Sequence, residues 1–435
     1  LPALRAVTAQ QVLQAQREQR ELSASAGPQG RLALTVLTAQ QEQLALLVSQ
    51  ERPELQVLQV LMVQQGQRVV VSSQGHEAIN NLLKRTQSQI EQLGGQGLVV
   101  KLSSSTSEMS DQRSLHGSAV QALRESAINQ EPDVLGATVF SLVKESYADA
   151  HFDLLVIDEA GQVSLSNLLY MSQCARNILL VGDQQQLSQP NRAKHPGDSG
   201  LSCLDYGMDG QPVVPPERGV FLATSWRMPP VLTDLVSQLF YQGELQGSAE
   251  NAANRVLWDG LEQGLLFQPV EHEGNGSASD EEVEAIAALV ERLLERPYAR
   301  MRFRDGVFVC EERTLTPNDI LITAPYNLQV NRLQRRLGDL ARVGTVDRFQ
   351  GQEAPVAIHS LTASDGDSAP RGLSFVLDPN RLNVAISRAQ CLCIVVGSPR
   401  LATDISSSVD GVRQLNRLCR LMAADRQALP MEVSA

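Results

Sequence analysis

The strongest chemical signal in the sequence is a pair of carboxylates that ends an apolar run, LLVIDEA (154–160). Short apolar runs are typical of strands buried on both faces of a parallel sheet. Ligand sites of open α/β sheets lie at the carboxyl ends of such strands. Asp158 can hold Mg²⁺ there, usually through water, and Glu159 can orient or deprotonate an attacking water. Taken alone, however, the pattern more often marks a strand followed by a polar turn.

A second polar cluster follows the next apolar run, NILLVGD (177–183), which ends in Gly182 and Asp183 before three glutamines. An amide such as that of Gln186, at a neighbouring strand end, can reach a terminal phosphate and report its presence. Taken by itself, however, the cluster is better explained as an ordinary loop, because the whole chain is rich in glutamine.

Strand-like and helix-like patterns alternate along the chain and position these polar clusters. The run VVVSS (69–73) enters the helical pattern HEAINNLLKR (76–85). Further apolar runs of the same type are GVFLATS (219–225), DILITAP (319–325), PVAIHSL (355–361) and CLCIVVGS (391–398). This alternation predicts the α/β class, with doubly wound parallel sheets.

Other segments predict helices and boundaries. Residues 4–22 and 38–49 have helix-forming compositions, and the second begins at an N-cap threonine with Gln41 at the capping-box position. Proline and glycine cluster in GQPVVPPER (210–218), which predicts a domain boundary. The loop 272–282 runs into the acidic N-terminus of a helix.

Composition limits the class of protein. The 435 residues carry 37 basic and 49 acidic side chains, and the net charge of −12 argues against a protein coated by nucleic acid but allows a narrow groove for one strand. The six cysteines are scattered without a CxxC pair and are interpreted as buried, reduced thiols of a cytoplasmic protein. No apolar run is long enough for a membrane span. The first residue, Leu1, is interpreted as a truncated start.

The order of the segments resembles that of the superfamily 1B helicases, which include RNA-surveillance helicases and the nuclease–helicases of DNA replication. The matching segments are VVVSSQGHEAINNLL (69–83, motif Ia), VLGATVFSL (134–142, Ic), IDEAGQ (157–162, II), LVGDQQQLSQP (180–190, III), TSWRMPP (224–230, IIIa), ITAPYNLQV (322–330, IV), VGTVDRFQGQEAPV (343–356, V) and LNVAISRAQ (382–390, VI). Within this family, WRMPP, VEHEGN, APYN and DRFQGQEAPV look most like bacterial chains in which the helicase follows a RecB-like nuclease domain.

The resemblance implies two RecA-like domains of the P-loop NTPase type, over residues 38–215 and 216–435, after a helical N-terminal remnant over 1–37. It implies binding of ATP with Mg²⁺, and of single-stranded DNA or RNA, with 5′–3′ translocation. A RecB-like nuclease domain on the same or a partner chain is a further implied partner.

The resemblance also implies roles for individual residues. Asp158 would hold Mg²⁺, Glu159 would activate water, and Arg227 and Arg388 would act as arginine fingers, whose planar guanidinium groups match phosphate oxygens. Further nucleotide contacts would come from Gln41, Asp183, Gln186, Gly351 and Glu353. The single-strand groove would be lined by Ser73, His76, Asn80, Thr138, Thr345 and Asp347.

One departure from the family affects its central chemistry. A superfamily 1 helicase has a GxxxxGK[ST] loop just before motif Ia, whose backbone N–H groups and lysine cradle the phosphates. No lysine of this chain follows a glycine, and about a strand and a loop are missing near 53–60. Two readings therefore stay open: an ATP-dependent helicase whose catalysis is impaired, and a non-catalytic single-strand-binding pseudohelicase or fragment of a nuclease–helicase. Coincidental motifs in an unrelated α/β protein are a third.

Overall fold

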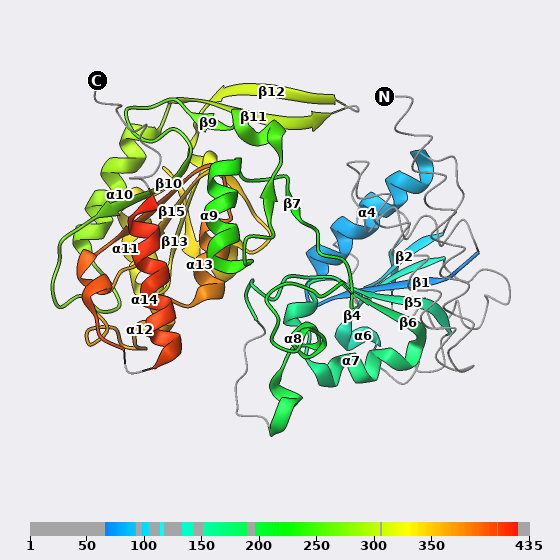
Figure 1. Cartoon of the computed structure of the whole chain (residues 1–435). Coiled ribbons are helices and arrows are strands. Elements are labelled where there is room, and N and C mark those ends of the chain that lie inside the picture. The colour runs from blue at the N-terminus through cyan, green and yellow to red at the C-terminus, as the bar shows by residue number, and fades with distance from the viewer. Residues whose placement is uncertain are drawn as a thin grey trace. The chain divides into compact units, whose positions relative to one another are not determined.

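The computed structural model describes residues 66–92, 98–103, 114–116, 133–142, 151–188, 196–216, 218–304, 307–406 and 408–424. Figure 1 shows the elements of these segments. Gln41 and the helices predicted over 4–22 and 38–49 lie outside them. The chain divides into two compact units, which are described separately. The first unit contains the residues up to Ile157, with Tyr170–Leu179 and Pro215–Val220, and the second unit contains Asp158–Leu169, Leu180–Val214 and Phe221 onward. The predicted boundary near residue 215 stays a prediction.

The first unit is built on a six-stranded sheet with the order β3-β2-β4-β1-β5-β6. Its strands are β1 (Val69–Ser73), β2 (Val99–Ser103), β3 (Ser114–His116), β4 (Val134–Thr138), β5 (Phe152–Ile157) and β6 (Ala175–Leu180). β1 lies parallel between β4 and β5, with Val69 beside both Val134 and Leu154. The predicted strands at 69–73, 154–157 and 177–180 are confirmed.

Helix α4 (His76–Gln92) packs on this sheet and confirms the helical pattern predicted after β1. Ile79 and Leu83 are buried on one face of the helix, at the spacing of an amphipathic helix. They lie over Gly136 of β4, where an added Cβ would come within 2.4 Å of the Leu83 side chain. Glycine at this position therefore lets α4 approach the sheet closely. The short helices α6 (Val139–Leu142) and α7 (Leu165–Met171) follow β4 and β5 in the chain.

The second unit is built on a five-stranded parallel sheet with the order β10-β16-β15-β13-β14. Its strands are β10 (Gly264–Pro269), β13 (Ile320–Ala324), β14 (Arg342–Thr345), β15 (Ala354–Ser360) and β16 (Ala389–Gly397). The central strands β13, β15 and β16 are buried at every residue, as their continuous apolar sequences predict.

Helices cover both faces of this sheet. One core cluster contains residues of α9 (Pro230–Phe240), α13 (Pro379–Ile386) and α14 (Val409–Met422), and the other contains residues of α10 (Asp280–Leu293) and α11 (Asn327–Leu337). The acidic helix start predicted after residue 272 is confirmed in α10, where the Ser279 side chain caps the helix by accepting from the Glu282 N–H. Remaining helices are α8 (Cys203–Met208) and α12 (Leu373–Val376). Both units have the α/β architecture expected of RecA-like domains.

Two features differ from the sequence prediction. The strand predicted over 219–225 is wrong for all but β7 (Thr224–Ser225), which pairs only with β8 (Gln246–Gly247). Residues 219–223 of this run form no strand. Its apolar residue Phe221 instead packs against the core cluster that contains α9. The antiparallel hairpin of β11 (Pro297–Arg304) and β12 (Val307–Thr314), extended by β9 (Arg255–Val256), was not predicted. Figure 1 shows it as a long two-stranded element of the second unit.

The six cysteines are all free thiols. Four of them are buried, and burial raises the pKa of their thiols, for example to about 12 at Cys203. The prediction of buried thiols is wrong for Cys310 and Cys419, which are exposed. Among the described residues, no helix is both long and apolar enough to cross a membrane.

Candidate active site

The carboxylates predicted from motif II lie in the turn directly after β5. Glu159 has φ 53° and ψ 44°, a left-handed conformation that is rare for residues other than glycine and costs on the order of 1–3 kcal/mol. The residue that follows β6 holds this turn in place, because the Ala160 N–H donates to the Val181 carbonyl over 2.9 Å. An added Cβ at Gly182 would lie 2.9 Å from that same nitrogen, so this close contact requires glycine. The structure therefore fixes an unfavourable backbone conformation at the predicted base.

The surroundings of Glu159 make its carboxylate more basic than usual. Burial raises its pKa first, and the neighbouring Asp158 raises it further, while the cationic Arg388 acts in the opposite direction. The Gln350 amide donates to the Glu159 carboxylate over 3.5 Å. A carboxylate with a raised pKa is better suited to accept a proton near neutral pH.

The loop after β6 is organised around the carboxylate of Asp183. One of its oxygens accepts from the Tyr241 hydroxyl over 2.5 Å and from the Gln186 amide over 3.1 Å. The other accepts from the Gln185 N–H over 2.8 Å. Burial and the neighbouring Asp183 raise the pKa of Tyr241, so the hydroxyl stays protonated and donates. Asp183 thereby fixes the orientation of the Gln186 side chain.

Helix α13 holds the same loop from a distant part of the sequence. The Asn383 amide donates to the Gln185 carbonyl over 2.9 Å and to the Tyr241 hydroxyl over 2.8 Å. One turn earlier, the Asn380 amide donates to the Gln184 carbonyl over 3.3 Å. Motifs III and VI are thus joined by hydrogen bonds within the second unit.

Arg388 connects this loop to motif V. Its side chain is 2% exposed and donates to the carbonyls of Val384 and Gln352, each over 3.1 Å. A third contact, of 3.5 Å, reaches the side-chain oxygen of Gln186. Burial, followed by the nearby Arg227, lowers the pKa of Arg388 to about 10, so the guanidinium stays charged at neutral pH. A buried cation is thereby aimed at the predicted phosphate-sensing glutamine.

Arg227 lies beside the same cluster but has a carboxylate partner. Its Nε donates to Glu353 over 2.7 Å, and its Nη1 donates to the Ser387 carbonyl over 3.1 Å. The other Glu353 oxygen accepts from the Gln390 amide over 2.6 Å. Gly351, which precedes this glutamate, has φ +75° and forms a turn that favours glycine. Glu353, one of the two motif V residues predicted to contact nucleotide, is therefore engaged with one of the predicted arginine fingers.

Four of the residues predicted to contact nucleic acid lie together in the first unit. Ser73 and Thr138 are register partners at the carboxyl ends of β1 and β4. His76 begins α4, with an exposed side chain, and Asn80 follows one turn later. The Asn80 side-chain oxygen is buried and has no hydrogen-bond partner within the described segments.

The other two predicted contacts belong to the second unit. Thr345 is the last residue of β14 and is half-buried. Asp347 begins the short helix η7 (Asp347–Phe349) and accepts from Arg381 over 3.4 Å. Both lie in the segment that leads from β14 to Gly351 and Glu353.

Several residues that complete this cluster were missed by the sequence analysis. Tyr241, Asn380 and Asn383 all lie on helices or at helix ends, where their spacing gave no signal beyond an amphipathic pattern. Their partners are 58 to 198 residues away in the sequence, so the contacts depend on the fold. The signal that could have found Asn383 is its position inside motif VI, LNVAISRAQ (382–390).

Comparison with known proteins gives two family matches. Residues 98–189 and residues 207–400 match two AAA domain families. The chain is 26% identical over 295 residues to the Schizosaccharomyces pombe DNA replication ATP-dependent helicase/nuclease dna2, covering 64% of this chain and 21% of that protein. It is 27% identical over 353 residues to the ATP-dependent helicase NAM7 of Saccharomyces cerevisiae, covering 76% of this chain and 33% of that protein. The chain therefore spans a third or less of these relatives.

Among solved structures, the chain is similar to an arterivirus nonstructural protein 10 (helicase) in complex with DNA. The TM-score is 0.41 at 13% identity, covering 82% of this chain and 60% of that one. The helicase MrfA bound to DNA and AMPPNP gives a TM-score of 0.39 at 10% identity, covering 84% of this chain and 46% of that one.

We predict that Tyr241→Phe destabilises the second unit by about 1–3 kcal/mol, because it leaves the Asp183 carboxylate and the Asn383 amide with fewer partners in a buried site. Urea denaturation, followed by tryptophan fluorescence, measures the change. Tyr206→Phe is the matched control, since the Tyr206 side chain is exposed. Equal stability of the two variants would contradict the assigned contact.

We predict that Glu159→Gln stabilises the protein at neutral pH, because it removes a charge that burial and Asp158 disfavour. The folded-state pKa is raised above 4.5, so the gain should be complete above that folded-state pKa and should disappear as the pH falls towards 4.5, where Glu159 is itself protonated. Thermal denaturation between pH 4 and pH 8 tests this. The exposed Glu244→Gln is the control, and a gain that is independent of pH would refute the electrostatic explanation.

Proposed function

Because the chain carries two AAA domains and is homologous to the superfamily 1 helicases, we propose that it is the motor part of such a helicase, which binds ATP with Mg²⁺ and a single nucleic-acid strand. The observation that carries this proposal is the contact between Gln186 and Arg388. This contact places the amide that we propose as the phosphate sensor beside a buried guanidinium within the second unit.

The residues around this contact fit the terminal phosphate and metal of a nucleotide. Mg²⁺ is usually bound by one or two carboxylates together with phosphate oxygens and water, so Asp158 is a sufficient protein ligand. Gln186 and Arg388 would donate to the terminal phosphate, and Glu159 would take a proton from the attacking water. The bound metal would neutralise the charge that develops on the phosphate oxygens.

Arg227 would have to exchange partners to reach a phosphate. It is paired with Glu353 over 2.7 Å, and both side chains are partly exposed. A pair of this kind contributes little to stability in water, so a phosphate group could replace the carboxylate at small cost. Release of Glu353 would then free it for the ribose. We propose this exchange as the step that couples nucleotide binding to motif V.

The phosphate cradle is the part that the sequence lacks. No Gly-Lys pair occurs anywhere in the chain, so the lysine and the backbone N–H groups of a Walker A loop are missing. Removal of one preorganised donor costs about 10²–10³-fold in rate, so loss of the cradle should cost at least about 10³-fold. This observation favours a second candidate function, a non-catalytic pseudohelicase that still binds one strand.

Our proposals about a nuclease domain, the type of nucleic acid and the cellular role rest on the relatives. One relative is a helicase/nuclease of DNA replication, so we propose a RecB-like nuclease domain on the same or a partner chain and a role in DNA repair. Another relative, from Neurospora crassa, is a regulator of nonsense transcripts 1 homolog, so we propose RNA as an alternative substrate. Translocation in the 5′–3′ direction and a cytoplasmic location are proposed on the same family basis.

We predict that the chain binds ATP·Mg²⁺ weakly and hydrolyses it negligibly, because the cradle is missing. Arg388→Ala should weaken the binding at least about tenfold, since it removes a charge-assisted contact to phosphate.

Insertion of a GPPGTGKT-type loop ahead of residue 69 should raise the ATPase rate, and Glu159→Gln should then abolish it. Calorimetry and a phosphate-release assay measure these effects. Rapid turnover by the unmodified chain that is lost on Glu159→Gln would show that the loop is dispensable.

We predict single-strand binding with little sequence preference, because contacts to phosphate and sugar carry no sequence information. With about four phosphates neutralised, the log–log salt slope should be about −3. His76→Ala combined with Thr345→Ala should weaken binding by about tenfold in fluorescence titrations with labelled oligonucleotides. The control pair is His151→Ala with Thr314→Ala, both exposed. Equal affinity of the two double variants would indicate that the motif segments are scaffold only.

A further inference from the structure

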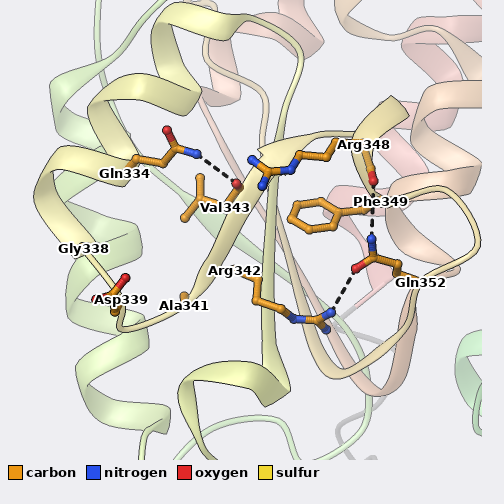
Figure 2. A pocket seen from close by; sticks show the side chains of 9 residues that line it. All are labelled: Gln334, Gly338, Asp339, Ala341, Arg342, Val343, Arg348, Phe349 and Gln352. Carbon is orange, nitrogen blue, oxygen red and sulfur yellow. Dashed lines mark hydrogen bonds between the residues drawn. The ribbon is translucent and has the colours of Figure 1, made fainter. Parts of the chain in front are cut away.

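A cavity of about 520 Å³ lies beside β14 in the second unit. Figure 2 shows the residues that line it. They are Gln334, Gly338, Asp339, Ala341, Arg342, Val343, Arg348, Phe349 and Gln352. Its volume falls within the range of about 300–1,000 Å³ that is typical of small-molecule sites.

The cavity lies at β14, which is the edge strand of this sheet among the described residues. The Gln334 amide, from α11, donates to the Val343 carbonyl over 3.1 Å and covers part of this edge. Across the strand, an added Cβ at Gly344 would lie 2.9 Å from carbon atoms of both Arg348 and Phe349. Glycine therefore allows these two side chains to close against the strand and shape the cavity wall.

Two guanidinium groups give the cavity its chemical character. Arg342 donates to the Gln352 side chain over 3.1 Å and to the Glu353 carbonyl over 3.0 Å. Its Nε is buried and has no hydrogen-bond partner in the part of the chain that the structure describes. Neither Arg342 nor Arg348 makes an ion pair with a carboxylate of a described residue. The charge of Arg348 is therefore not neutralised by direct contact, whereas Asp319 partly offsets the charge of Arg342 electrostatically.

The remaining lining residues restrict the ligand further. The Phe349 ring lies between the Arg342 and Arg348 side chains, and Asp339 lies on the opposite side, in the turn after α11 (Figure 2). A matching ligand therefore carries an anionic group at one end and hydrogen-bond donors at the other. Arginine forks fit phosphate bidentately, and Asp339 accepts from hydroxyl or amino groups.

We propose that this cavity binds a phosphate-bearing ligand of nucleotide size, with the phosphate on the Arg348 guanidinium and the sugar or base towards Asp339. The ligand would be either a free nucleotide or the 5′-phosphorylated end of a strand, since both present the same chemistry. The cavity shares its loop with Thr345 and Asp347 on one side and with Gly351 and Glu353 on the other. Occupancy would order the loop that carries both sets of predicted contacts.

The test is isothermal titration calorimetry of the whole chain with three probes: AMP, the dinucleotide pdTpdT, and dTpdT without the terminal phosphate. We expect AMP or pdTpdT to bind and dTpdT to bind at least about tenfold more weakly. Which of the two phosphorylated probes binds more tightly identifies the source of the ligand. Failure of both phosphorylated probes to bind would overturn the proposal.

Variants separate this cavity from the proposed ATP site and from general electrostatic attraction. Arg348→Ala should weaken binding of the phosphorylated probe at least about tenfold. Arg335→Ala is the matched control, because Arg335 is an exposed arginine of α11 that does not line the cavity. Equal losses in these two variants would overturn the proposal.

Gln186→Ala should leave binding of the phosphorylated probe unchanged within about twofold, because the Gln186 side chain contacts Asp183 and Arg388, neither of which lines the cavity. Binding lost in Gln186→Ala but kept in Arg348→Ala would place the ligand in the ATP site and overturn the proposal. If Arg348→Ala reduces stability, as judged by circular dichroism, Arg348→Lys replaces it. That variant keeps the charge but loses the bidentate geometry, and unchanged affinity would equally contradict the assigned phosphate contact.

Discussion

A single buried guanidinium organises the candidate site of the second unit. Arg388 cannot be solvated by bulk water, so its charge must be balanced by the groups that surround it. Two backbone carbonyls and the Gln186 side chain provide that balance. These acceptors come from motifs III, V and VI. The hydrogen bonds of one cation therefore hold three distant segments in register. The loop after β6, the start of β15 and helix α13 all depend on it.

The carboxylates near Arg388 are held rigidly, and one of them has an unfavourable backbone conformation and a raised pKa. Glu159 is held in a left-handed conformation with a raised pKa, and Asp183 is committed to Tyr241 and Gln186. Such strained or electrostatically perturbed groups persist only where the surrounding structure enforces them, and they concentrate at functional sites. These features support our proposal that the cluster responds to a nucleotide, although the sequence lacks the loop that would hold the phosphates.

Sequence patterns predicted the buried strands well but not the contacts between them. The runs at 69–73, 154–157, 320–324 and 355–360 are short and mainly apolar, and each forms a strand of a parallel sheet. The run at 219–225 fails, since apolar residues can also pack against a core without joining a sheet. Tyr241 could not be predicted, because its role follows from Asp183 and Asn383, which only folding brings to it.

The central claim is that Gln186 and Arg388 act as one unit towards a nucleotide. A double-mutant cycle on ATP·Mg²⁺ affinity, with Gln186→Ala and Arg388→Lys alone and together, tests this most directly. Residues that share one network show interaction energies of about 0.5–3 kcal/mol, so the double variant should lose clearly less affinity than the two single losses combined. Losses that simply add would show that the two side chains bind independently and would contradict the account.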